Sequence, residues 1–129
     1  AVKYNLPVKV IVINNDTLGQ SKWEQMDMLL TPTYGCDLER IDFAMVARAC
    51  GAKSYRLEDP KQCAAVFREA MATEGPVLID AIVDPLEAPM PANITFDQAL
   101  KFGESLLRGE RHAVKIAKTI AEDKIREMI

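Results

Sequence analysis

An apolar run at residues 8–13, Val-Lys-Val-Ile-Val-Ile, constrains the fold more than any other feature of the sequence. Val and Ile favour strands, and a run without polar alternation is typical of a strand covered on both faces, as in a parallel sheet. A second buried strand is expected at residues 76–83, and a short strand at residues 54–57. Because parallel strands need long crossovers, the residues between them must supply helices.

The first crossover helix is predicted to begin after Asp42 and to end at Gly51. Aspartate can cap a first helical turn, and glycine adopts the left-handed conformation that closes many helices. The apolar positions follow the i, i+3, i+4, i+7 spacing of a helix with one buried face. These positions are Phe43, Val46, Ala47 and Cys50.

The second crossover helix opens at Asp59-Pro60, where a capping carboxylate precedes a proline in the first helical position, and Gly75 ends it. Its expected buried positions are Cys63, Val66, Phe67, Ala70 and Met71. The order strand, helix, strand, helix, strand predicts a three-layer α/β fold, in which right-handed crossovers place helices on both sides of a parallel sheet.

The segments outside these strands and crossover helices give the predicted domain boundaries. A helix is expected around residues 20–29, and residues 31–38 form a loop with one proline and one glycine. Residues 1–86 are then an incomplete α/β domain, and residues 87–129 a proline-rich linker with C-terminal helices. In this tail the predicted apolar stripes are Phe96, Ala99, Leu100 and Leu106 after a cap at Thr95, and Val114, Ala117, Ile120, Ala121 and Met128 in the last helix.

Composition excludes several classes of function. The net charge is −3, so no basic surface points to nucleic acid. No apolar run approaches the ~20 residues that span a bilayer, and no signal-peptide pattern is present. Cys36, Cys50 and Cys63 are odd in number and have no close-pair spacing, which favours a reducing cytoplasm. Cys50 and Cys63 fall on apolar helix faces and are predicted to be buried.

The chemistry of the sequence is concentrated where the first strand ends, in Asn14-Asn15-Asp16-Thr17-Leu18-Gly19. Open parallel sheets bind ligands at the carboxyl ends of their strands. Amide and backbone carbonyl oxygens suit magnesium, and Asp16 is the only local carboxylate. Gly19 and the helix start behind it offer N–H groups to a phosphate. The residues alone leave a second interpretation open, in which Asn-Asn-Asp is only a turn and a helix cap.

The end of the thiamine-diphosphate motif resembles residues 6–19, Leu-Pro-Val-Lys-Val-Ile-Val-Ile-Asn-Asn-Asp-Thr-Leu-Gly. That motif begins with Gly-Asp-Gly and closes with an asparagine pair after a buried strand. Residues 42–51 and 75–80 resemble the segments that follow in the same domain, and the similarity covers most of residues 1–100. The chain thus resembles the thiamine-diphosphate-binding domain of the pyruvate oxidase and acetolactate synthase family.

The resemblance implies particular roles for the residues of the strand end. Asn15 would give its side-chain oxygen to magnesium, and Thr17 its backbone carbonyl. Leu18 and Gly19 would lie along the diphosphate, and Asp16 would be a turn residue rather than a ligand. The Gly-Asp-Gly half, whose aspartate is the charged magnesium ligand of the family, is absent from these 129 residues. We therefore expect the chain by itself to be inactive and to bind no thiamine diphosphate measurably.

Within the family, Glu24 helps to choose a branch. Its spacing from Asn15 is similar to that in pyruvate oxidases, where an acidic residue faces the substrate side of the thiazolium, so Glu24 is the candidate catalytic residue. Trp23 lies one position short of the register of acetolactate synthases. Apart from the resemblance, Glu24 is a solvated helix residue and Trp23 a packing residue. His112 is expected at the surface without a catalytic role.

The resemblance implies decarboxylation of a 2-oxo acid, as in pyruvate oxidase or pyruvate dehydrogenase (quinone). An acetolactate synthase-like carboligase is the alternative, and a non-catalytic α/β interaction module is the alternative of another class. The implied cofactors are thiamine diphosphate and magnesium, with FAD left open for the full-length protein. The implied partners are a small 2-oxo acid and further copies of the chain, in a dimer or tetramer.

Two features predict that the chain is a fragment. Residues 1–5 resemble the last turn of a helix whose beginning is absent. The strand that carries Gly-Asp-Gly is absent too, which would leave sheet edges unpaired and apolar faces uncovered. We expect such a chain to associate with itself.

Overall fold

The computed structural model describes residues 1–29, 31–87, 103–104, 107–109 and 112–127. The chain divides into two compact units. Unit 1 comprises residues 1–15 and 40–83, and unit 2 comprises residues 16–39 and 84–129. No helix in the described part of the chain is long and apolar enough to cross a membrane.

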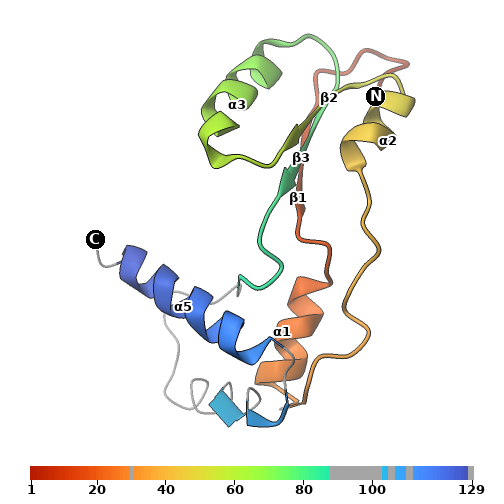
Figure 1. Ribbon diagram of the computed structural model, residues 1–129. Helices are drawn as coiled ribbons and strands as arrows, with labels where there is room; N and C mark the ends of the chain where they lie inside the picture. The colour runs from red at the N-terminus through yellow and green to blue at the C-terminus, as the bar shows by residue number, and fades with distance from the viewer. Residues whose placement is uncertain (30, 88–102, 105–106, 110–111, 128–129) are drawn as a thin grey trace. The chain divides into compact units, whose positions relative to one another are not determined.

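Among the described residues, unit 1 holds a parallel sheet of three strands (Figure 1). The strands are β1 (Lys9–Asn14), β2 (Lys53–Leu57) and β3 (Val77–Ile82), in the order β1-β3-β2. The last strand in the chain is therefore central, and its residues pair with both neighbours. Each predicted strand is confirmed to within a residue of its expected bounds.

Two helices cover opposite sides of this sheet (Figure 1). α2 (Phe43–Ala49) lies between β1 and β2 in the chain. α3 (Cys63–Ala72), preceded by the 3-10 turn η1 (Pro60–Gln62), leads from β2 back to β3. The two crossovers run in opposite directions along the sheet, so the same right-handed sense places their helices on opposite faces. The predicted α/β fold with flanking helices is confirmed.

The predicted start and stop signals of these helices are also confirmed. The side chains of Asp42 and Asp59 each accept from a backbone N–H of the following turn, at 2.6 and 3.0 Å. Gly51 and Gly75 follow the two helices with φ of +84° and +73°. Glycine enters this left-handed region without the steric cost that a Cβ brings.

The face of the sheet under α3 is an apolar core. One buried cluster consists of Leu57, Ala70, Val77 and Ile79. On the same side of the sheet, the Lys9 ammonium donates to the backbone carbonyls of Thr73 (2.6 Å) and Gly75 (2.7 Å). These carbonyls follow the end of α3, where a helix leaves acceptors without intrahelical partners and favours positive charge.

The predicted buried stripes of the two helices are partly wrong. α2 buries Ala47 as predicted, together with Ala44, but Val46 and Cys50 are exposed. In α3 the buried residue is Ala70, Val66 is half-buried, and Cys63, Phe67 and Met71 are exposed. α2 packs on β2 and β3, and α3 packs on β2 among the strands, so each helix buries only part of its predicted stripe.

The prediction that the first strand is covered on both faces is also wrong. Val10, Ile11 and Ile13 are 47, 44 and 65% exposed. Among the described residues β1 pairs with β3 alone, so it is an edge strand with an open side. The unpaired edge and the uncovered apolar faces expected from the sequence are both present.

Residues 1–5 have the hydrogen bonds of a helix end. The Asn5 N–H donates to the Val2 carbonyl (3.1 Å), the Leu6 N–H donates to the Ala1 carbonyl (3.0 Å), and Asn5 has a φ of +48°. This pair of bonds around a left-handed residue is the Schellman arrangement that closes α-helices. The local geometry predicted for residues 1–5 is confirmed.

Unit 2 contains α1 (Gly19–Asp27) and α5 (Ala113–Glu127). Its buried cluster consists of Trp23, Met26, Leu86 and Ile116. The stripe predicted for the last helix is wrong, because Val114 and Ala117 are exposed while Ile116 is buried. Residues two apart point to different sides of a helix, so burying Ile116 turns Val114 outward.

Some predictions lie outside the described residues. These are the helix capped by Thr95, with Phe96, Ala99, Leu100 and Leu106, the linker beyond residue 87, and the side chains of Ile120, Ala121 and Met128. The division of the chain at residues 86 and 87 stays a prediction.

Candidate functional site

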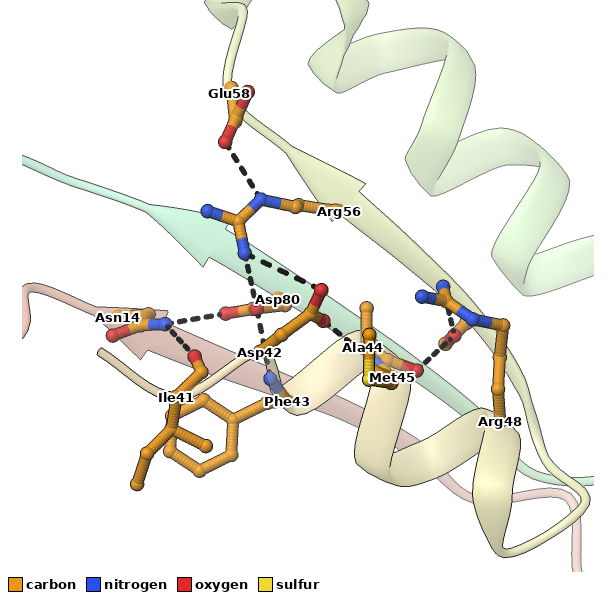
Figure 2. A network of polar contacts seen from close by, with 11 residues as sticks. Asn14, Ile41, Asp42, Phe43, Ala44, Met45, Arg48, Arg56, Glu58 and Asp80 are labelled. Carbon is orange, nitrogen blue, oxygen red and sulfur yellow. Dashed lines mark hydrogen bonds and ion pairs between the residues drawn. The ribbon is translucent and has the colours of Figure 1, made fainter. Parts of the chain in front are cut away.

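β1 ends with Asn14 at the carboxyl edge of the sheet, and several contacts hold this residue (Figure 2). Its side-chain Nδ2 donates to the Asp80 carboxylate (3.0 Å) and to the Ile41 carbonyl (3.2 Å). Its backbone carbonyl accepts from the Val83 N–H (3.0 Å). Asn14 is only 6% exposed. The end of the strand is therefore fixed inside unit 1.

Asp80 is the centre of this polar network. It lies on β3 and is fully buried. Its Oδ2 accepts from the Phe43 N–H at the start of α2 (3.1 Å) and lies 3.7 Å from Nη1 of Arg56. A carboxylate removed from water is strongly destabilising unless donors replace the lost water. Here every named partner is a donor, so the burial of Asp80 is compensated.

Arg56 closes the network on the solvent side. Its Nε donates to Glu58 (2.7 Å), and its Nη1 lies 3.9 Å from Oδ2 of Asp42, the capping residue of α2. The hydrogen bond to Glu58 raises the pKa of the Arg56 guanidinium, and the charges of Asp42 and Asp80 act in the same direction. One guanidinium thus faces three carboxylates from different parts of unit 1, which Figure 2 shows.

The sequence patterns do not reveal this network, because Asp80 lies within a predicted buried strand and no pattern singles out Arg56. A signal was present, because Asp80 is the only charged residue in the run at 76–83. A carboxylate in such a run must find donors in the fold. The sequence did not identify those donors, since Asn14 lies 66 positions away.

The predicted cofactor residues lie directly after Asn14. Asn15 is half-buried and is the last residue of the first segment of unit 1. Asp16 has a φ of +51°, a left-handed conformation that aspartate tolerates better than most residues. This conformation fits the predicted role of Asp16 as a turn residue.

In unit 2, Thr17 forms an antiparallel bridge with Asp37. The flanking residues make the hydrogen bonds: Leu18 donates to the Cys36 carbonyl (2.8 Å), and Leu38 donates to the Asp16 carbonyl (3.0 Å). In this pattern the central pair directs its own N–H and C=O away from the partner segment. The Thr17 hydroxyl also donates to Cys36 (2.9 Å), and Thr17 is only 7% exposed. The backbone of Thr17 is therefore held in place, with its carbonyl directed away from the loop.

α1 begins two residues after Thr17, at Gly19. Leu18 is its N-cap and has no side-chain acceptor, so it caps none of the first-turn N–H groups. Such N–H groups, together with the helix dipole, attract an anion. The N–H of Leu18 itself is bonded to Cys36, so Gly19 and the residues after it are the ones whose N–H groups could meet a phosphate beside Leu18.

The other predicted residues are distributed over unit 2. Glu24 is exposed on α1 and accepts from Nε2 of Gln20 at 3.2 Å. Trp23 is buried in the core cluster, which confirms its interpretation as a packing residue. His112 is exposed, as expected.

The candidate metal ligands after the strand end are a side-chain amide oxygen and a backbone carbonyl oxygen. Within the described residues no group of three or more His, Cys, Asp or Glu side chains is placed to hold a metal ion. Hard oxygen donors suit magnesium, which commonly completes its shell with phosphate oxygens and water. The chemistry of these donors thus fits a magnesium–diphosphate group.

A family model described as thiamine pyrophosphate enzyme, C-terminal TPP binding domain, matches residues 1–81. The chain belongs to this thiamine pyrophosphate (thiamine diphosphate) enzyme family. The matched region contains the whole sheet of unit 1 except Ile82, and the turn from β1 into α1.

Curated relatives agree with this family. YdaP of Bacillus subtilis, described as a thiamine pyrophosphate-containing protein, is 35% identical over 108 residues, which are 84% of this chain and 18% of that protein. Acetolactate synthase of Bacillus subtilis is 37% identical over 84 residues, 65% of this chain and 15% of the enzyme. Pyruvate oxidase of Lactiplantibacillus plantarum is 34% identical over 93 residues, 70% of this chain and 15% of the enzyme.

A solved thiamine pyrophosphate enzyme has the same fold over most of the chain. It is the thiamine diphosphate-dependent 4-hydroxybenzoylformate decarboxylase of Rhodococcus jostii, with a TM-score of 0.61 and 27% identity over 65% of this chain and 16% of that one. The chain therefore spans less than a fifth of the length of these relatives.

Proposed function

We propose that this chain forms part of the thiamine diphosphate site of an enzyme that decarboxylates a 2-oxo acid, in the manner of pyruvate oxidase or pyruvate dehydrogenase (quinone). The strand end of the family-matched region carries the proposal. β1 ends at Asn14, the left-handed Asp16 turns the chain, and α1 begins at Gly19. The carboxyl ends of parallel strands are where open α/β sheets bind their ligands.

In this proposal Asn15 binds magnesium through its side-chain oxygen, and Thr17 binds it through its backbone carbonyl. Leu18 and Gly19 lie along the diphosphate, where the start of α1 favours negative charge. The bound cofactor supplies the electron-accepting ring that decarboxylation needs. The residues of this chain bind the diphosphate end and fix its orientation.

We also propose Glu24 as the catalytic residue on the substrate side. A carboxylate can accept or donate a proton when it lies within hydrogen-bonding reach of the reacting group. The support is its exposed position on α1, the helix that begins at the proposed diphosphate site.

An acetolactate synthase-like carboligase is the second candidate. The observation that favours it is the 37% identity to acetolactate synthase, against 34% to pyruvate oxidase. The two candidates differ in the second substrate, which is an electron acceptor for the oxidase and a second 2-oxo acid for the carboligase.

The cellular location and the oligomeric state of the enzyme are also part of the proposal. We place it in the cytoplasm, as a dimer or tetramer, with FAD left open. Support for the location is that Cys36, Cys50 and Cys63 are all free thiols. Support for self-association is the open edge and the exposed apolar residues of β1.

The protein that contains this chain is the material for the test. An oxidase or dehydrogenase consumes pyruvate only with an electron acceptor, whereas a carboligase forms a carbon–carbon bond without one. We expect acceptor-dependent pyruvate consumption that requires thiamine diphosphate and magnesium. Asn15→Ala should raise the magnesium concentration needed for half-maximal activity, while Asn5→Ala, in the distant N-terminal turn, should not. A protein that binds no thiamine diphosphate and turns over no 2-oxo acid would instead be a non-catalytic module.

The 129-residue chain gives a second test. One amide oxygen and one backbone carbonyl are too few ligands for tight magnesium binding, since sites of this kind use carboxylates as well. Titration calorimetry with magnesium and thiamine diphosphate should therefore show no measurable binding, and micromolar affinity would contradict the proposed division of the site.

A further inference from the structure

The polar network around Asp80 lies on one face of β3, and the opposite face is apolar. Ile79, the preceding residue, belongs to the buried cluster under α3. Consecutive side chains of a strand point to opposite faces, so Asp80 faces the side of α2. The sheet of unit 1 could be buried on this side without a carboxylate, as it is on the other. Burial of the sheet thus does not require the Asp80 carboxylate, and its role lies in the contacts that it makes with its neighbours.

The contacts of Asp80 converge on the end of β1. A side-chain amide has two N–H groups, and in Asn14 they serve Asp80 and Ile41. The Asn14 carbonyl accepts from Val83, just beyond the end of β3. Both its backbone and its side chain are thus tied to neighbouring segments, so the next residue leaves the strand from a fixed point.

Asn14 and Asn15 consequently have different structural roles. Both Nδ2 hydrogens of Asn14 are committed to the fold, and the side chain is buried (Figure 2). Asn15 is half-buried and follows the last residue of the strand. The orientation of the Asn14 side chain is therefore fixed by the fold.

We infer that Asp80 is a positioning residue for the cofactor site. Its carboxylate orients Asn14, and Asn14 sets the point and direction from which Asn15 leaves β1. The metal-binding part of this inference rests on the proposed function above. The orientation of the strand end by Asp80 does not.

Asp80→Asn is the most direct variant, because it keeps the shape of the side chain. A carboxylate offers acceptors to both Asn14 and Phe43, whereas an amide offers one oxygen and one NH₂ group. In Asp80→Asn the NH₂ group therefore faces either Asn14 or Phe43, and that hydrogen bond is lost. Asn14→Ala is the second variant, and it removes the link to β1 while Asp80 keeps Phe43 and Arg56 as partners.

Two matched controls separate positioning from general loosening. Glu58→Gln is the same acid-to-amide change in another partner of Arg56, but on an exposed side chain. Ile79→Val loosens the same strand from its apolar face. Neither change touches Asn14.

Hydrogen exchange read by mass spectrometry tests the orientation of the strand end in the protein that contains this chain. Asp80→Asn and Asn14→Ala should each speed exchange by about tenfold in the segments 15–19 and 81–85, the cost of one lost hydrogen bond. Glu58→Gln and Ile79→Val should leave the segment 15–19 near the wild-type rate. Wild-type exchange at 15–19 in both test variants, or equal acceleration in Ile79→Val, overturns the inference.

Binding of Mn²⁺, followed by electron paramagnetic resonance with thiamine diphosphate present, tests the metal-binding part. Both test variants should weaken Mn²⁺ binding by about tenfold, as is usual when a group that orients a metal ligand is lost. The controls should bind as the wild type does. If Asn15→Ala leaves the affinity unchanged, the proposed ligand is wrong, and the exchange data still decide whether Asp80 orients the strand end. If Asn15→Ala weakens binding but neither test variant does, positioning of the metal ligand by Asp80 is refuted.

Discussion

The side-chain amide of Asn14 donates to the carboxylate of Asp80 at 3.0 Å, although 66 positions separate the two residues in the chain. The bond joins the carboxyl end of the edge strand β1 to the buried face of the central strand β3. Asn14 precedes the proposed metal ligand Asn15. The bond therefore joins it to β3, the strand that pairs with both other strands of the described sheet.

Replacing Asp80 by alanine should be one of the most destabilising single changes in unit 1. The donors of Asn14 and Phe43 would stay buried without their acceptor, and a loss of this kind costs about 3 kcal/mol. Urea denaturation should show a lower midpoint for Asp80→Ala, with Glu58→Ala near the wild-type value because Glu58 is exposed. Equal midpoints for Asp80→Ala and the wild type would mean that the network contributes nothing to stability.

Gly75→Ala should be more destabilising than Gly35→Ala. Both glycines have left-handed φ, +73° and +68°, so alanine is strained at either position by about 1–2 kcal/mol. At Gly75 a Cβ would also lie 2.5 Å from Oδ1 of Asn5, whereas at Gly35 it meets nothing within 4 Å. Thermal denaturation measures both losses. The extra loss at Gly75 should disappear in an Asn5→Ala background, and its persistence there would assign it to another contact.

The ion pair of Lys53 and Glu69 should make stability depend on pH at both ends of the range. Their hydrogen bond at 2.8 Å lowers the pKa of Glu69 and raises the pKa of Lys53. A lowered carboxyl pKa adds stability above the unfolded pKa, which is lost as the pH falls through the folded value. A raised ammonium pKa adds stability below the unfolded pKa, which is lost as the pH rises through the folded value.

Comparing the wild type with Glu69→Gln isolates this contribution. The difference in melting temperature should be greatest between the two pKa values and should shrink in acid, in alkali and at high salt, because both partners are largely exposed. A difference that stays constant across pH would show that the charge of Glu69 plays no part.

The three cysteines should differ in reactivity. Cys50 and Cys63 are exposed, and Cys36 is buried in the loop that pairs with Thr17 and Leu18. A brief treatment with N-ethylmaleimide, read by mass spectrometry, should modify Cys50 and Cys63 in the native chain and Cys36 only after denaturation. Rapid modification of Cys36 would indicate that the bridge to Thr17 opens readily.

The strands and helix ends of unit 1 could be predicted because their signals are local. Val and Ile runs specify β1 and β3, and the caps at Asp42 and Asp59 act on the turn that follows them. The same local signals placed the candidate cofactor residues at the end of β1. Assignment to the family needed several segments together.

Burial could not be predicted as well, because it depends on how much sheet lies beneath each helix. Val46 and Phe67 have suitable spacing for a buried face, yet they are 52 and 37% exposed. The partners of Asp80 could not be predicted either. Asn14 and Arg56 are brought to Asp80 by strand pairing, and no local pattern encodes that register.

The order of strands has a consequence for the way the chain folds. β1 precedes β2 and β3 in the chain, yet its partner in the sheet is β3. Lys9 can therefore pair with Val77 only after the whole segment between them has been brought back toward β1. Contacts between such distant residues form slowly, because a long loop must close before any pairing compensates for its lost entropy. During synthesis the residues proposed to bind the cofactor therefore leave the ribosome before β3 does, and their strand acquires this partner only afterwards.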